Sequence, residues 1–327
     1  MPKTVVEARD LVRHFNDTVA VDGISFTVAE GEIFGFLGPN GAGKTTCINM
    51  LCTLLRPTSG SALIAGFDVV RDALRVRSNI GLVFQDTTLD DYLTASENLS
   101  FHAELYGVPA EICHDRLELV LSMVDLLDRK DHLVNTFSGG MKRRLEIARG
   151  LIHSPRVLFL DEPTVGLDPQ TRSHIWKYIH ELQEREAITI FLTTHYMDEA
   201  EHCNRIAIVD QGKLGVVDTP DALKAQVGKD RIELVVPDTE ATILALKEKF
   251  GLKATISEDA VTFFVTGGEE FVPRLFAELG QTISSIRVAR PTLDDVFMTH
   301  TGHTIRDAEA GAGDRLRSHS MRWRGRR

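Results

Sequence analysis

The segment Gly38-Pro39-Asn40-Gly41-Ala42-Gly43-Lys44-Thr45 fits the pattern G-x-x-x-x-G-K-[ST], which is typical of loops that bind nucleotide phosphates. A short apolar run, 33–37, precedes it and predicts a strand, and residues 44–55 predict a helix that ends before Pro57. Glycines let backbone N–H groups converge on phosphate oxygens, and the helix N-terminus adds partial positive charge. This context favours a nucleotide site over a glycine-rich turn with a stray lysine.

Two side chains of the loop have specific expected roles. Lys44 can reach the outer phosphates, and the Thr45 hydroxyl can bind Mg²⁺. The residues of this segment that we expect to bind ATP are Gly38, Pro39, Asn40, Gly41, Ala42, Gly43, Lys44, Thr45 and Thr46.

A second apolar strand, 157–160, ends in two carboxylates, Asp161 and Glu162. We expect Asp161 to hold Mg²⁺ through water, because this small ion keeps much of its hydration shell. Glu162 is then placed to polarise the attacking water, which makes it a candidate catalytic residue. Alone, Asp-Glu-Pro is equally compatible with a polar turn. Together with the phosphate loop it indicates an ATPase with ATP and Mg²⁺ as its cofactors.

The segment Phe137-Ser138-Gly139-Gly140-Met141 precedes a helical pattern with Leu145 and Ala148 on its apolar face. Ser138 can cap that helix, and the two glycines let a ligand approach the backbone closely. A helix that begins with two glycines exposes its first N–H groups and is a candidate anion site, although the chain already has a phosphate loop. With this segment the chain resembles the ABC ATPase family, in which the signature of one subunit closes over the γ-phosphate held by the other.

The resemblance covers about residues 4–225 and implies further site residues. They are Phe15 stacked on adenine, Gln85 joining the Mg²⁺ and water site to the membrane partner, Asp168 at the dimer interface, and His195 contacting the γ-phosphate and aligning the water with Glu162. Taken singly, each has a plain alternative: a core phenylalanine, a strand-end glutamine, a capping aspartate and a strand-end histidine. Met141 stands where the family usually has glutamine, so contacts from Ser138 and the backbone are the ones expected to remain.

The pattern of elements predicts an α/β fold. For residues 1–227 it predicts a P-loop NTPase domain of the ABC ATPase type, with an antiparallel β subdomain near the start and an inserted helical subdomain at about 86–154. In the helical subdomain, Thr94 and Glu97 have capping-box spacing. Residues 228–303 have the order β-α-β-β-α-β, which predicts a small α+β, ferredoxin-like domain.

The C-terminal region carries two further signals. Pro291-Thr292-Leu293-Asp294-Asp295-Val296-Phe297 and the small domain before it look like the C-terminal region of daunorubicin-resistance-type ATPase subunits, although an ordinary helix capped by Thr292 has the same pattern. That resemblance implies an exporter of drugs, antibiotics or lipids. The tail 304–327 contains six arginines from Arg315 onward and is expected to be disordered, either solvated or in contact with anionic lipid head groups.

The composition limits the location and partners. The chain of 327 residues has a formal charge of −10 and no apolar run near the roughly 20 residues that span a bilayer. We therefore expect the chain to stay in the cytoplasm and to have no nucleic-acid partner. The resemblance implies that it is a peripheral protein on the cytoplasmic face of the cell membrane. Its four cysteines lack the spacing of a metal site and show no pattern that predicts a disulfide.

The resemblance also implies partners. The signature and the phosphate loop belong to different halves of each site, so two copies should form a head-to-tail homodimer. A separate integral membrane permease subunit is expected to supply the transport pathway. The competing function is a non-transport ABC ATPase acting on nucleic acid or ribosomes. A P-loop kinase or GTPase is a third possibility, but it would have no role for Ser138 or His195.

Overall fold

The computed structural model describes residues 3–257 and 260–302. The chain divides into two compact units, whose border in the sequence falls between Thr219 and Pro220. The Arg-rich tail lies outside the described residues. Within the two described ranges, no helix combines the length and apolar character needed to cross a membrane.

The first unit is built on a six-stranded sheet with the order β10-β9-β3-β8-β7-β6. All neighbouring strands pair in parallel except β10, which is antiparallel to β9. The strands are β3 (Ile33–Leu37), β6 (Ile80–Val83), β7 (Val157–Asp161), β8 (Thr189–Thr194), β9 (Arg205–Asp210) and β10 (Lys213–Asp218). Every residue of β3 and β7 is buried, as expected for parallel strands covered on both faces.

A second sheet, ordered β2-β1-β4-β5, confirms the predicted antiparallel region. Its strands are β1 (Thr4–Phe15), β2 (Thr18–Ala29), β4 (Ser59–Ile64) and β5 (Phe67–Asp68). Phe26 of β2 packs edge-on against Phe36 of β3, with ring centroids 5.0 Å apart. The two sheets therefore share one hydrophobic core, and the antiparallel sheet is fixed against the strand that leads into the phosphate loop.

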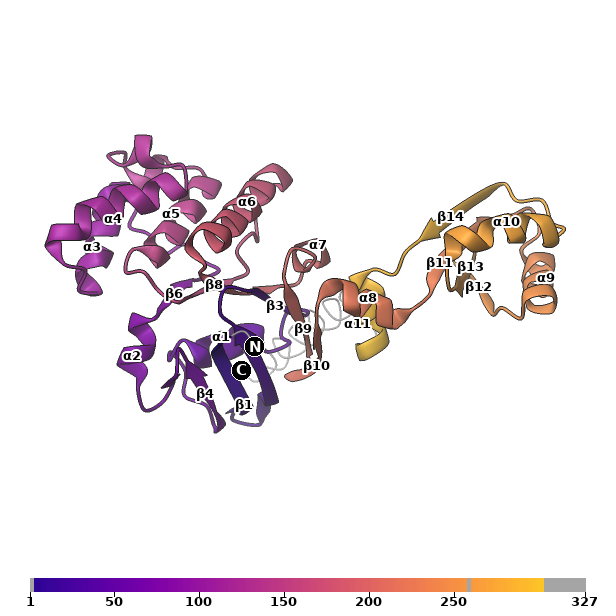
Figure 1. The fold of residues 1–327 in the computed structure, drawn as a ribbon, viewed down its shortest axis with the longest axis horizontal. Coiled ribbons are helices and arrows are strands. Elements are labelled where there is room, and N and C mark those ends of the chain that lie inside the picture. Colours follow the sequence, from indigo (N-terminus) through magenta and orange to yellow (C-terminus); the bar gives the residue numbers. More distant parts are fainter. Residues whose placement is uncertain (1–2, 258–259, 303–327) are drawn as a thin grey trace, which may run out of the picture. The chain divides into compact units, whose positions relative to one another are not determined.

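Helices accompany the sheets, and three of them group together between β6 and β7 in the sequence (Figure 1). This group is the predicted helical subdomain: α3 (Ala95–Leu105), α4 (Ala110–Met123), the 3₁₀ turns Leu127–Arg129 and Val134–Thr136, and α5 (Gly139–Leu151). The other helices of the unit are α1 (Lys44–Leu51), α2 (Ala73–Ser78), α6 (Pro169–Glu186) and α7 (Met197–Ala200).

One helix boundary differs from the sequence-based expectation. α1 ends at Leu51, four residues early, because Thr53 adopts a left-handed conformation with φ 64°. The Asn98 side chain binds both the N–H and the C=O of Asp90 and so holds the loop before Thr94. The capping box of Thr94 and Glu97 forms as predicted.

The second unit contains a four-stranded antiparallel sheet with the order β12-β13-β11-β14. Its elements are α8 (Pro220–Val227), β11 (Asp230–Val235), α9 (Thr239–Phe250), β12 (Ala254–Ser257), β13 (Ala260–Val265), α10 (Gly268–Glu278), β14 (Ser285–Ala289) and α11 (Leu293–Thr301). The sequence of strands and helices from β11 to β14 confirms the ferredoxin-like prediction. α8 and α11 pack against each other, and Thr292 caps α11 as expected.

Candidate active site

The carboxyl ends of three neighbouring parallel strands bring the principal candidates together. β3 leads into the phosphate loop, β7 ends at Asp161, and β8 ends at Thr194, directly before His195. These strands lie side by side in the order β3-β8-β7, so their ends meet at one edge of the sheet. This is the edge at which open α/β sheets bind ligands.

The phosphate loop needs glycine at particular positions. Gly41 and Gly43 adopt positive φ angles of 85° and 100°. A Cβ atom on Gly43 would lie 2.4 Å from the Ala20 carbonyl oxygen, and one on Gly38 would lie 2.1 Å from that of Val209. The loop can therefore hold this shape against the neighbouring backbone only without side chains at these points.

Lys44 lies almost completely inside this loop, with 4% of its surface exposed. Its Nζ donates to the carbonyl oxygens of Gly38 and Pro39, at 2.7 and 3.1 Å. Nζ also lies 3.3 Å from Glu162 Oε1. The lysine that the sequence assigns to phosphate thus also forms an ion pair with the candidate catalytic carboxylate.

An oxygen-rich group suited to Mg²⁺ lies beside Lys44. The Thr45 hydroxyl is 3.3 Å from Asp161 Oδ1, and the Thr193 hydroxyl donates to the same carboxylate oxygen at 2.5 Å. Hydroxyl and carboxylate oxygens are the ligands that Mg²⁺ prefers, with water and substrate phosphates completing its shell. The donor set of Thr45 and Asp161 therefore fits this ion.

Glu162 is buried, with 7% exposed, and its backbone is left-handed with φ 46°. Its N–H donates to Thr193 Oγ1 at 3.0 Å, and His195 Nδ1 lies 3.4 Å from its Oε1. Burial raises the pKa of the Glu162 carboxyl, but His195 and Lys44 together outweigh burial and leave the pKa below its ordinary value of 4.5. Glu162 is therefore ionised at neutral pH and able to accept a hydrogen bond from water.

The other candidates gather at a second place, where the N-termini of α5 and α6 meet. Ser138 caps α5 by accepting from the Met141 N–H at 3.3 Å, and Asp168 caps α6 by accepting from the Thr171 N–H at 3.0 Å. Thr171 also donates its hydroxyl to Asp168 at 2.6 Å. A Cβ atom on Gly140 would lie 2.4 Å from Thr171 Cγ2, so the two helix starts are in close contact.

Two candidates stand apart from both groups. Phe15 ends β1 with 42% of its surface exposed, and the Arg13 guanidinium lies over its ring at 4.5 Å. This ring is available for stacking, whereas a core phenylalanine would be covered. Gln85 follows β6 on an exposed bend.

Sequence reasoning missed several polar residues behind the site. Thr193 binds both Asp161 and Glu162, and Glu199 is buried with the hydroxyls of Thr164 and Thr194 on its carboxylate. Arg143 of α5 is also buried and reaches the end of β7. The spacing of Arg143 and Arg149, three residues before and after Glu146, could have indicated a buried ion-pair cluster on this helix. The pattern alone does not show this, because a charged helix face is usually solvated.

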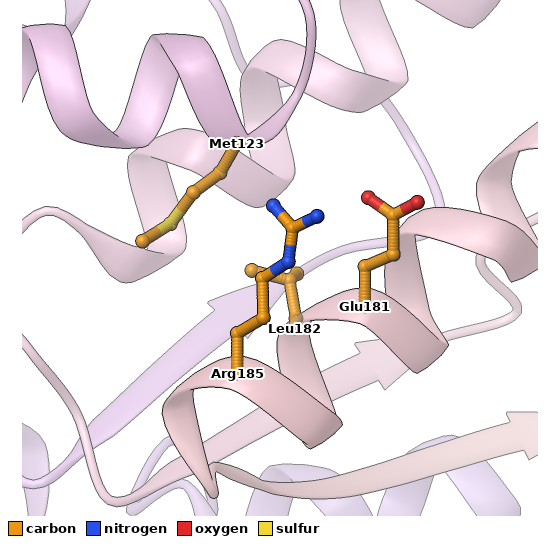
Figure 2. Close-up of a pocket in the computed structure, with 4 residues that line it drawn as sticks. All are labelled: Met123, Glu181, Leu182 and Arg185. Carbon is orange, nitrogen blue, oxygen red and sulfur yellow. The ribbon is translucent and has the colours of Figure 1, made fainter.

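Outside this region, a small hollow lies between the end of α4 and α6 (Figure 2). It is lined by Met123, Glu181, Leu182 and Arg185 and measures about 10 Å³. That is room for about one water molecule. The hollow is therefore too small for a nucleotide.

The fold and this geometry define a P-loop ATPase. Two family models match separate parts of the chain: the ABC transporter model at residues 21–165, and the model of the C-terminal domain of DrrA1-3-like ATP-binding proteins at residues 219–301. The second match coincides closely with the second compact unit.

Relatives match over nearly the whole length. The daunorubicin resistance ATP-binding protein DrrA2 of Streptomyces coeruleorubidus is 40% identical, covering 93% of this chain and 97% of that protein. The linearmycin resistance ATP-binding protein LnrL of Bacillus subtilis is 36% identical, covering 93% and 100%. The Nod factor export ATP-binding protein I of Burkholderia lata is 38% identical, covering 94% and 100%.

Solved structures of ABC transporter ATP-binding proteins also resemble this chain. The structure of cbiO1 from Clostridium perfringens, part of an ABC transporter complex, has a TM-score of 0.64 and 28% identity, covering 76% of this chain and 96% of that one. The ATP-binding cassette MJ0796, solved as a dimer bound to ADP and Pi, has a TM-score of 0.59 and 27% identity, covering 65% and 98%. The chain belongs to the ABC transporter family, as one of its ATP-binding, ATP-hydrolysing proteins.

Proposed function

We propose that two copies of this chain close head to tail over two ATP molecules and power an exporter formed by a separate integral membrane subunit. The observation that carries this proposal is the division of the site. Lys44, Thr45, Asp161, Glu162 and His195 meet at the strand ends, whereas Ser138, Gly139, Gly140 and Asp168 gather at the starts of α5 and α6. The dimeric relative bound to ADP and Pi supports such a pairing.

In each site, one copy holds the nucleotide. The phosphate loop from Gly38 to Thr46 cradles the phosphates with its N–H groups, and Phe15 stacks on the adenine. Thr45 and Asp161, with Gln85 brought in from its exposed bend, would hold Mg²⁺. Mg²⁺ offsets charge on the phosphate oxygens when it is bound.

The other copy completes the site from the start of its α5. The first N–H groups of a helix have no partner within the helix, so those of α5 can bind the γ-phosphate. Ser138 adds its hydroxyl, and Gly139 and Gly140 let the backbone approach closely. Asp168 lies beside them, where it can cross to the partner copy.

Hydrolysis depends on Glu162. Lys44 and His195 both lie near its carboxylate. With Lys44 engaged by the phosphates, Glu162 can polarise the attacking water, and His195 lies close enough to align that water and contact the γ-phosphate. Loss of the γ-phosphate removes the contacts that hold the two copies closed, and the dimer relaxes.

A membrane partner is supported by exposed apolar side chains on α2, before α3 and on α3. Leu74, Tyr92, Phe101 and Leu105 are each more than half exposed, which is unusual for several large apolar side chains in one part of a chain. An apolar surface of an integral membrane protein could bind these side chains and remove them from water. We place the chain on the cytoplasmic face of the membrane because of this surface and because its relatives are named as ATP-binding proteins of resistance and export.

Export of a drug, an antibiotic or a lipid-like molecule is the proposed transport activity. The support comes from relatives named for daunorubicin resistance, linearmycin resistance and Nod factor export, which match this chain over their full or nearly full length. Affinity purification from membranes tests the partner. A polytopic membrane protein should be recovered with the chain, and recovery with ribosomes or DNA instead would overturn the transport function.

Glu162→Gln tests the division of the site and the role of Glu162 together. The substitution keeps the side-chain volume but removes the charge that polarises water, so steady-state ATP turnover should fall on the order of 100-fold or more. With hydrolysis blocked, ATP should hold two copies together, and the dimer should be visible by light scattering. Unchanged turnover would show that another residue activates the water.

A further inference from the structure

Arg143 is a buried arginine where α5 meets the segment after β6 and the segment after β7. It lies on α5, five residues after Ser138, and only 6% of its surface is exposed. Its guanidinium donates to the backbone carbonyl of Phe84, directly before Gln85. It also donates to the carbonyls of the segment that follows β7: Pro163 at 2.7 Å, Asp161 at 3.1 Å and Glu162 at 3.3 Å.

The bonds to residues 161–163 hold the segment of backbone that sets the direction of the Glu162 side chain. Its backbone turns through a left-handed conformation with φ 46°, which costs a residue other than glycine free energy and needs surrounding contacts to hold it. Arg143 binds the carbonyl on each side of that turn, and Thr193 binds its N–H. The planar fork of arginine suits such a set of acceptors, whereas the point charge of lysine does not.

The charge of Arg143 is balanced by a buried carboxylate on the same helix. Glu146 has no exposed surface, and its Oε2 lies 3.2 Å from Arg143 Nη1. Its other oxygen accepts from the Thr88 N–H at 2.8 Å and lies 3.8 Å from Arg149. Glu146 thereby anchors Arg143 and also ties the loop after Gln85 to α5.

We propose that Arg143 is a positioning residue that holds Glu162 in place for hydrolysis within its own chain. This rests on the proposed function of Glu162 and of the head-to-tail dimer. Because Arg143 and Ser138 share one helix, α5 closes the partner's site with its first turn and orders its own Glu162 with its second. Movement of α5 on ATP binding is thus passed from one ATP site to the other.

Arg143→Met in the full chain tests this role. Methionine keeps much of the apolar volume but loses every bond to the carbonyls. We expect kcat for ATP to fall at least about tenfold while the KM for ATP stays within about twofold, because the hydrogen bonds that the structure describes for Arg143 go to residues after β6, at and after the end of β7 and on α5, and not to the phosphate loop. The Hill coefficient for ATP should also fall toward one.

The matched control is Arg116→Met. Arg116 also donates to backbone carbonyls of the same region, those of Leu151 and Ile152 at the far end of α5, but not to the residues after β7. The kcat of the Arg116→Met variant should stay within about twofold of the wild-type value. An equal loss in both variants would mean that Arg143 merely stabilises α5.

A second measurement separates Arg143 from the signature helix start. In a Glu162→Gln background, adding Arg143→Met should leave ATP-dependent dimer formation intact and lower the residual turnover no further. Loss of the dimer would show that Arg143 acts through Ser138 and would overturn the proposal. Failure of Glu162→Gln alone to form the dimer would instead contradict the proposed function.

Glu146→Gln covers the case in which Arg143→Met does not fold. It preserves shape and removes the charge that anchors Arg143, so kcat should fall with little change in KM. A folded Glu146→Gln protein with wild-type kcat would overturn the proposal.

Discussion

At the scale of single residues, the balance of charge around Glu162 is the most informative feature. Its pKa lies below 4.5 because Lys44 and His195 outweigh burial. A carboxylate whose pKa falls on folding adds stability above its unfolded pKa, and this contribution is lost as the pH drops through the folded pKa. Lys44 should therefore stabilise the chain more at neutral pH than in acid.

Lys44→Met removes the ammonium group that lies beside the buried Glu162 carboxylate. We expect it to lower the unfolding free energy by about 3 kcal/mol near pH 7, and by less in acid, as the pH falls through the lowered pKa of Glu162 and its carboxylate is protonated. Urea unfolding at neutral pH and at a series of acid pH values measures the difference. Lys142→Met is the control, since Lys142 pairs with the half-exposed Asp91 and should contribute less than about 1 kcal/mol. A loss that does not change with pH would contradict this account.

At the scale of elements, the contact between the starts of α5 and α6 depends on Gly140. In Gly140→Ala the new methyl group would push against Thr171 Cγ2 and so break the bond from Thr171 to Asp168. Loss of that cap contact should cost about 1 kcal/mol, read as a lower melting temperature of the nucleotide-free chain. In Gly139→Ala the methyl would meet only Leu167 at 3.8 Å, so no loss is expected.

The double variant Gly140→Ala, Thr171→Ser tests whether the clash with Thr171 Cγ2 causes the loss of stability. Serine lacks the clashing methyl group and keeps the hydroxyl that binds Asp168. The double variant should recover most of the lost stability. If it melts no higher than Gly140→Ala alone, the clash is not the reason.

At the scale of the whole molecule, the two compact units have separate hydrophobic cores. We expect two calorimetric transitions in the full chain. In the Glu162→Gln variant, ATP at about 100 times its dissociation constant adds about 2.7 kcal/mol to the unit that binds it. That corresponds to a rise of roughly 5–10 °C in one transition only.

Leu246→Ala identifies the other transition. Leu246 is fully buried in the core of the second unit, and its truncation should cost about 2–5 kcal/mol there. The transition that it lowers should be the one that ATP leaves unchanged. A single cooperative transition that both changes shift together would contradict independent units.

The sequence by itself determined the features that depend on local backbone geometry and on periodicity. The glycines of the phosphate loop, the carboxylates after an apolar strand and the cap at Ser138 are each encoded within a few residues, and the order of strands and helices predicted both folds. The tertiary structure decided the rest. Arg143 looks like a residue of a solvated helix face, and only the packing of α5 against β6 buries it against the end of β7. The ion pair of Lys44 with Glu162 likewise depends on β8 lying between β3 and β7, since strand order is set by long-range burial and hydrogen bonding, which local sequence does not specify.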